Sequence, residues 1–207
     1  MGFGIALIGY AFLLMGDVGG ALFAAPVLAY GFFLASRLEG NFLRASISSL
    51  FMLPRGIFMI IYSFVNMKDG PYIGLMNTLN TVTFLLFQLA WLTMSFFWLT
   101  AVINIAKECN SAMILKRARI TQAITLPYIA ASTVATMLNS GGMLLHYAGA
   151  VSVIMFILMY LVIIFNIVML HTCFVLITSE RQYEKDKQRL AKERAEAMKK
   201  ANEKSKK

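Results

Sequence analysis

Arg55 is the residue of this sequence whose type and position point most directly to chemistry, because it lies inside an apolar segment, between Pro54 and Gly56. An arginine within a membrane-spanning segment is by default a candidate for a functional role. A guanidinium held beside a proline kink is suited to binding a carboxylate or a phosphate. In the alternative interpretation, Arg55 marks the cytoplasmic interface and extends to lipid headgroups, and residues 46–53 form an interfacial helix.

Gln88 and Asn166 are two further polar residues in apolar surroundings, and each belongs to a series with seven-residue spacing that places its members on one helix face. The two series are Thr81, Gln88 and Ser95, and Ser152, Asn166 and Cys173. Such a face can line a solute path or can join helices through hydrogen bonds of about 0.6–2 kcal/mol each. We therefore predict a candidate polar or anion-binding site of Arg55, Gln88 and Asn166, with helix packing as the alternative role of both series.

Catalytic and metal-binding patterns are missing from the sequence. It contains no HExxH, GxSxG or GxxxxGK[ST] motif, and its predicted spans contain no Asp or Glu. Ser46, Ser48 and Ser49 have no credible general base, and His171 has no second histidine at helical spacing, whereas a metal needs three or four ligands. We predict a non-enzymatic protein with no catalytic residues, no cofactor and no metal, and keep an intramembrane enzyme as a remote alternative.

The composition indicates which elements must position these residues. Of 207 residues, 59% are hydrophobic and only 14% are charged, whereas soluble domains have about 45–50% and 25%. Residues 1–179 therefore form a transmembrane helical domain, and the expected fold is an all-α integral membrane protein with a bundle of six transmembrane helices. The spans are predicted at 2–16, 21–36, 46–67, 75–106, 120–139 and 147–179. Span 2–16 is short enough to be re-entrant, which would leave five crossings.

The basic residues predict the orientation of the protein. Arg37, Arg44 and Arg55, together with Lys107, Lys116, Arg117 and Arg119, flank one side of the predicted spans, and Lys68 is alone on the other side. The positive-inside rule then places both termini in the cytoplasm.

Residues 180–207 form a basic tail with 11 Lys and Arg against 6 Asp and Glu, and no Pro or Gly. We expect the last transmembrane helix to continue into this tail as one cytoplasmic helix. The tail is expected to contact anionic lipid headgroups or a protein partner, and no pattern for nucleic-acid binding is present. The residues chosen for these contacts are Lys192, Arg194, Lys199 and Lys200.

These observations favour a subunit of a larger membrane transport or assembly complex. It would contact partners through the tail and through helices rich in small residues, such as Gly4, Ala6, Gly9 and Ala11. The same small residues could instead let the first two helices approach each other. A self-contained small-solute carrier or channel, with a path lined by Arg55, Gln88 and Asn166, is the alternative function.

Overall fold

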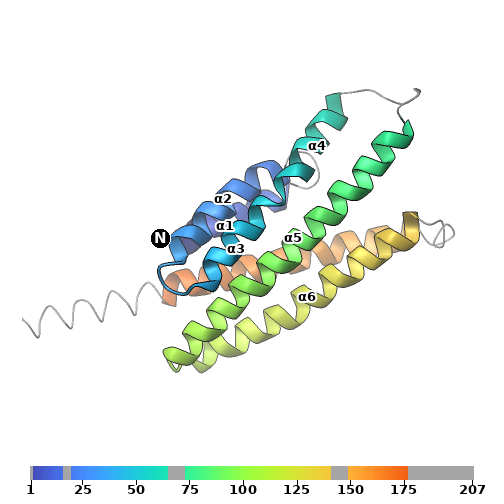
Figure 1. Ribbon diagram of the computed structural model, residues 1–207. Helices are drawn as coiled ribbons and strands as arrows, with labels where there is room; N and C mark the ends of the chain where they lie inside the picture. The colour runs from blue at the N-terminus through green and yellow to red at the C-terminus, as the bar shows by residue number, and fades with distance from the viewer. Residues whose placement is uncertain (1, 16–19, 65–72, 141–148, 177–207) are drawn as a thin grey trace, which may run out of the picture.

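The computed structural model in Figure 1 describes residues 2–15, 20–64, 73–140 and 149–176. Within these ranges every regular element is a helix, as the sequence predicts. A last helix, Gly149–Leu176, is the orange one without a label in Figure 1. The labelled helices are α1 Gly2–Leu13, α2 Gly20–Ala35, α3 Asn41–Leu50, α4 Leu53–Phe64, α5 Ile73–Glu108 and α6 Ala112–Ser140.

Three of the described helical stretches are long and apolar enough to cross a membrane, and they support a membrane location. They are Asn41–Phe64, which combines α3 and α4, then Gly74–Glu108 and Gly149–Leu176. α1 and α2 are apolar but shorter, and the 12 residues of α1 rise only about 18 Å. α6 is long but carries polar and basic residues along its length.

A break between α3 and α4 confirms the interruption that Pro54 predicts in the third span. α3 ends at Leu50, and the amides of Phe51 and Met52 turn back to the carbonyls of Ser48 and Ser49, at 3.2 and 3.1 Å. Pro54 has no N–H to donate to Leu50, so the helical hydrogen-bond ladder cannot pass through this point. α4 starts directly afterwards, and α3 and α4 follow one another along the bundle (Figure 1).

α1 and α2 form an antiparallel pair whose close approach depends on small residues. A Cβ atom on Gly31 would lie 2.6 Å from the backbone nitrogen of Ala6, and a Cβ atom on Gly9 would lie 2.6 Å from Leu28 Cγ. Both glycines and Ala6 are buried. The expectation that small residues let the first two helices approach is therefore confirmed for Ala6 and Gly9, whereas Ala11 is exposed.

The remaining helices complete a bundle around this pair. α3 packs against α2 and α5, α4 packs against α2 and α5, and α5 packs against α6. The last helix joins through side chains: the Tyr128 hydroxyl of α6 donates to the carbonyl of Met155 at 3.0 Å, and the Tyr160 hydroxyl donates to the carbonyl of Leu14 at 3.3 Å. The last helix thereby contacts both α6 and the residues that follow α1, so the two ends of the described sequence meet in the bundle.

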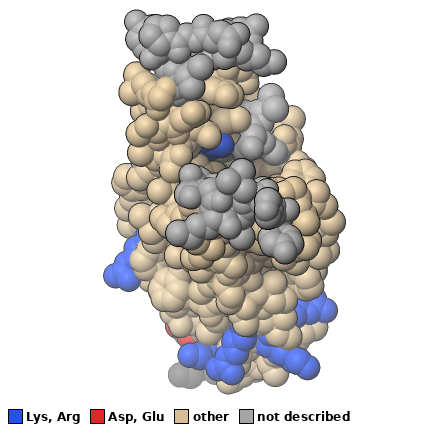
Figure 2. Space-filling model, turned by 90° about the vertical axis from the view of Figure 1, so that its right-hand side faces the viewer, with Lys and Arg blue, Asp and Glu red and all other residues tan. Residues whose placement is uncertain are grey.

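Basic side chains gather at one end of this bundle. The α2–α3 and α5–α6 connections lie together at the lower left of Figure 1, and Figure 2 shows Lys and Arg clustered at the corresponding end. Arg37 lies in the α2–α3 connection, and Arg44, Lys107 and Lys116 lie near the helix ends that these connections join. At the α5–α6 turn, Asn110 has a φ of 51°, and the Ser111 amide donates to the Ala106 carbonyl at 2.9 Å. Asparagine tolerates this left-handed conformation and so ends α5 sharply.

Candidate functional site

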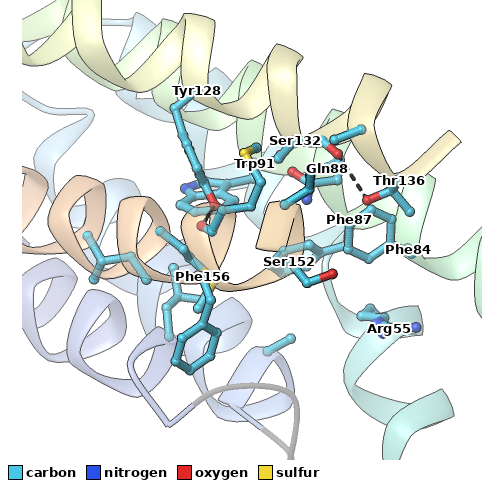
Figure 3. Close-up of a pocket in the computed structure, with 17 residues that line it drawn as sticks. Arg55, Phe84, Phe87, Gln88, Trp91, Tyr128, Ser132, Thr136, Ser152 and Phe156 are labelled. Atoms are coloured by element: carbon cyan, nitrogen blue, oxygen red, sulfur yellow. Dashed lines mark hydrogen bonds between the residues drawn. The ribbon is translucent and has the colours of Figure 1, made fainter. Parts of the chain in front are cut away.

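A cavity of about 370 Å³ lies inside the bundle, among α5, α6 and the last helix (Figure 3). Its volume falls within the usual range of small-molecule sites. The ends of α1 and α2 contribute Leu13 and Ala21, and α4 contributes Arg55. The other lining residues used below are Phe84, Phe87, Gln88 and Trp91 from α5, Tyr128, Ser132, Ala135 and Thr136 from α6, and Ser152, Met155 and Phe156 from the last helix.

The cavity lies several helical turns away from the basic end. Its α5 residues, Phe84 to Trp91, lie in the middle of α5, whereas Lys107 lies at the end of that helix. Its α6 residues, Tyr128 to Thr136, likewise lie far along α6 from Lys116. α5 and α6 run in opposite directions from their shared turn, so the lining residues of the two helices lie at a similar distance from that turn.

A packed aromatic layer joins α1, α2 and α5 on the side of the cavity toward the basic end. Tyr10, Phe32 and Trp98 are fully buried, and Trp98 Nε1 donates to the Tyr10 hydroxyl at 2.9 Å. The rings of Phe32 and Trp98 stack with centroids 6.1 Å apart. Leu99, the next residue of α5, is fully buried as well, so the place where α1, α2 and α5 meet is tightly packed.

Gln88 places a polar group on the cavity wall. Its side chain is only 5% exposed, and its Oε1 has no hydrogen-bond partner among the described residues. A buried carbonyl oxygen without a partner costs free energy unless water or a ligand supplies a donor. This oxygen is enclosed by protein atoms, so a molecule in the cavity could supply that donor only if the Gln88 side chain moved.

Three residues of α6 with hydroxyl groups line the same space, and each hydroxyl is hydrogen-bonded to a backbone carbonyl. Ser132 Oγ donates to the Ile129 carbonyl at 2.9 Å, and Thr136 Oγ1 donates to the Ser132 carbonyl at 2.9 Å. Tyr128 likewise donates to Met155 of the last helix. Each of these oxygens retains lone pairs and can accept a hydrogen bond from a molecule in the cavity, and each hydroxyl can also rotate to donate one.

Arg55 lies at one edge of the cavity and contacts α5. Its side chain is 7% exposed, and its Nη1 donates to Asn80 Oδ1 at 2.7 Å and lies 3.5 Å from Thr83 Oγ1. Its guanidinium carbon lies 5.5 Å from the centroid of the Phe84 ring, a distance typical of cation–π contacts. α3 packs against α2 and α5, and Arg55 follows it at a buried position in α4.

The three residues of the predicted site do not come together. Arg55 and Gln88 line one cavity, but Asn166 is not among the lining residues. Asn166 is fully buried between α6 and the last helix, where its Nδ2 donates to Thr125 Oγ1 at 3.0 Å and to the Val162 carbonyl at 2.7 Å. Its contacts match the packing role that the sequence left open.

The other members of the two seven-residue series have different surroundings. Ser95 is fully buried in the core, whereas Thr81 donates to the carbonyl of Asn77 within α5. Ser152 lines the cavity, and Cys173 is buried. His171 is exposed on the last helix. The tail residues Lys192, Arg194, Lys199 and Lys200 lie outside the described residues.

Sequence reasoning missed the polar side of α6. Tyr128, Ser132 and Thr136 are spaced four residues apart and therefore lie along one face of the helix. This spacing was available as a signal within the predicted span 120–139. It is partly hidden because Thr and Ser are common throughout α6, including positions such as Thr133 that do not line the cavity.

Comparisons of this chain with protein-family models, with curated proteins and with solved structures find no match.

Proposed function

We propose that this chain is a non-enzymatic, multi-pass membrane protein that binds a small molecule in the cavity of its helix bundle. The observation that carries this proposal is the cavity of about 370 Å³ among α5, α6 and the last helix, whose wall combines Gln88, Ser132, Thr136 and Ser152 with apolar side chains. No Asp, Glu, His or Cys is among the described lining residues, which supports binding over catalysis.

The proposed topology has six crossings, with α3 and α4 forming one of them and with both termini in the cytoplasm. Its support is the cluster of basic side chains at one end of the bundle (Figure 2) and the positive-inside rule. In this orientation the cavity lies several helical turns from the cytoplasmic end, and the Tyr10–Trp98 pair lies on its cytoplasmic side.

We favour binding over conduction, because a channel needs a continuous path. Tyr10, Trp98 and Leu99 are fully buried and tightly packed on the side of the cavity toward the basic end. A carrier would have to separate α1 from α5 at the Tyr10–Trp98 hydrogen bond to pass a solute inward.

The subunit role favoured by the sequence gains less support from these contacts. Ala6, Gly9 and Gly31 are used to pack α1 against α2, so a partner helix cannot reach them. Ala11 is exposed, but a single small residue on a helix face is weak support for a docking site. The other proposed contact surface, the basic tail, lies outside the described residues.

Native mass spectrometry of the full chain, released from nanodiscs after purification from its own membranes, tests the binding proposal. We expect a small molecule bound at one copy per chain. Ala135→Phe fills the cavity and should remove this molecule. Ala130→Phe is the matched control, because Ala130 is exposed on the same helix and does not line the cavity. A chain that carries no added mass, or equal loss in both variants, would overturn the proposal.

A further inference from the structure

We infer that the ligand of this cavity is an amphiphilic monoanion, with a carboxylate at the Arg55 end of the cavity and an apolar chain or ring at the opposite end. This inference rests on the proposed function, since it names the ligand class of the same cavity. It follows from three features of the wall: the positive charge of Arg55, the hydroxyl groups that lie at the same end as this charge, and the apolar side chains at the other end.

The contacts of α5 distinguish the two ends of the cavity. Arg55 contacts the Phe84 ring, and its Nη1 donates to Asn80, one turn earlier on α5. Trp91 lies two helical turns beyond Phe84, or about 10 Å further along the helix axis. The Trp91 ring meets the Tyr128 ring of α6 edge to face, with centroids 6.1 Å apart. The cavity therefore has an Arg55–Phe84 end and a Trp91–Tyr128 end.

Two contacts of α6 fix the direction of the last helix. Arg117, near the start of α6, donates to Thr172 at 3.1 Å, whereas Tyr128, further along α6, donates to the carbonyl of Met155. The last helix is therefore antiparallel to α6. Ser152 lies one turn before Met155, so it lies on the side of the Tyr128 contact that is remote from Arg117.

Thr136 and Ser152 consequently lie at the Arg55 end of the cavity. Thr136 follows Tyr128 by two helical turns, and α6 is antiparallel to α5, so Thr136 lies toward Phe84 and away from Trp91. Figure 3 shows Thr136 and Arg55 at the right of the cavity and Tyr128 at the left. A hydroxyl group can rotate to donate to a carboxylate, so both side chains can support an acid group at this end.

Arg55 supplies the charge that selects an anion. Its side chain is 7% exposed, and its Nη1 donates to Asn80 Oδ1 at 2.7 Å and lies 3.5 Å from Thr83 Oγ1, which are neutral acceptors. A guanidinium has five N–H donors in a planar fork and can bind a carboxylate alongside neutral acceptors. In surroundings of low dielectric constant its charge attracts an anion and repels an ammonium group.

A single negative charge fits this wall better than two. Arg55 is the one charged residue among the described residues that line the cavity. A buried charge without a counter-charge costs several kcal/mol, so a dianion such as a phosphate monoester would bring one charge too many. A carboxylate brings one.

The opposite end of the cavity is suited to an apolar body. Trp91 lines it from α5, and Met155, Met159 and Ile163 line it from the last helix, one turn apart. Such side chains gain dispersion energy against a chain and favourable ring contacts against an aromatic group. A second polar group of the ligand would be buried among them at a cost in free energy.

Three probes of equal chain length test this inference on the full chain in nanodiscs of neutral lipid: ω-bromooctanoate, ω-bromooctanol and ω-bromooctylammonium. Bromine quenches tryptophan emission at short range, and Trp91 lines the apolar end, so quenching also reports that the tail lies there. Trp91→Phe should remove this quenching. Partitioning into lipid is subtracted with the cavity-filled variant Ala135→Phe. Measurements at about pH 9 keep the carboxylic acid ionised in the bilayer.

We expect the acid to quench at a concentration at least about tenfold lower than the alcohol, the factor that one charge-assisted hydrogen bond supplies. The ammonium probe should bind more weakly than the alcohol. The methyl ester of the acid should bind like the alcohol on the unmodified chain, so this comparison does not depend on the folding of a variant.

Three variants assign the preference for the acid to Arg55. Arg55→Gln should abolish the preference, and Arg55→Lys should retain it, because lysine keeps the positive charge. Arg119→Gln is the matched control, since Arg119 is exposed near the start of α6, and it should leave the preference unchanged.

The carboxylate can belong to a fatty acid from the membrane or to an aromatic acid from the aqueous phase. The ring probe para-bromobenzoate, compared with para-bromobenzyl alcohol, distinguishes these sources. Tighter binding of the octanoate assigns the chain and tighter binding of the benzoate assigns the ring, and either result supports the inference when the acid binds more tightly than its alcohol.

Failure of the ligand class is distinguishable from failure of the proposed function. Equal binding of acid and alcohol would show that the chain itself already balances the charge of Arg55, and would overturn the ligand class. Tighter binding of the ammonium probe, or a preference that survives Arg55→Gln, has the same consequence, and the binding cavity still stands. If no probe quenches the unmodified chain more than Ala135→Phe, the proposed function fails together with the ligand class.

Discussion

Trp98 Nε1 donates a hydrogen bond of 2.9 Å to the Tyr10 hydroxyl and so connects α5 to α1 in the fully buried part of the bundle. The two rings also meet edge to face, with centroids 6.0 Å apart. This pair therefore contributes to the contact between α1 and α5 on the side of the cavity toward the basic end.

Replacing Tyr10 by Phe should lower the free energy of unfolding by about 1 kcal/mol, because it removes one buried hydrogen bond and leaves the rings in place. A double-mutant cycle with Trp98→Phe, measured by denaturant unfolding in micelles, should show coupling of similar size. Tyr62→Phe, at an exposed position on α4, is the control and should be neutral. Strictly additive effects of Tyr10→Phe and Trp98→Phe would contradict this prediction.

Gly31→Ala should destabilise the α1–α2 pair. The added Cβ atom would lie 2.6 Å from the backbone nitrogen of Ala6, so the helices must separate, at a cost of about 1–3 kcal/mol. Gly74→Ala in α5 is the matched control, because no atom lies within 4 Å of its added Cβ. Thermal unfolding in the same detergent should therefore show a lower midpoint for Gly31→Ala alone. Equal midpoints would show that α1 and α2 are not packed as described.

Arg55→Gln should cost about 2 kcal/mol, because it removes the charged hydrogen bond to Asn80 and the contact with the Phe84 ring. The comparison is Arg119→Gln, an arginine that is exposed near the start of α6. Unfolding curves of the two variants separate the internal role of Arg55 from a contact with headgroups. If both changes are equally mild, the headgroup interpretation is the better one.

Cys109 offers a direct test of the proposed orientation. Its thiol is exposed at the α5–α6 turn, whereas Cys173 is buried, so a membrane-impermeant maleimide should react at Cys109 alone. In intact cells we expect labelling only after the membrane is permeabilised, because this turn lies at the basic end of the bundle, which we propose to be cytoplasmic. The variant Cys109→Ser is the control and should show no labelling. Labelling without permeabilisation would reverse the topology and place the cavity toward the cytoplasm.

The predicted spans agree with the helices where lipid immersion determines the sequence. Span 75–106 corresponds to α5, and span 21–36 corresponds to α2. The agreement fails where a helix leaves the apolar region: α6 starts at Ala112, well before the predicted 120. Hydropathy detects residues that avoid water, whereas a helix continues as long as its backbone hydrogen bonds do. Lys116, Arg117 and Arg119 are compatible with both a helix and water.

The start of the third span shows the same limit. Helix α3 begins at Asn41 instead of 46, and the Glu39 carboxylate accepts hydrogen bonds from the Asn41 amide, at 2.8 Å, and from its side chain, at 2.9 Å. Asn104 of α5 also donates to this carboxylate, at 3.4 Å. The first turn of α3 is polar and is stabilised partly by α5, so the hydropathy of the local sequence does not reveal where α3 begins.

The amino-acid sequence by itself determined the helical class, the approximate position of each apolar helix, the proline break before Arg55 and the concentration of basic residues at alternate connections. These follow from local composition, since lipid and the backbone impose the same demands on every span. Only the tertiary structure decided that Arg55 and Gln88 share a cavity, that Asn166 does not, and that Ser132 and Thr136 complete its wall. The rotation of each helix about its axis depends on how side chains from several helices fit together, and seven-residue spacing within one helix does not specify it.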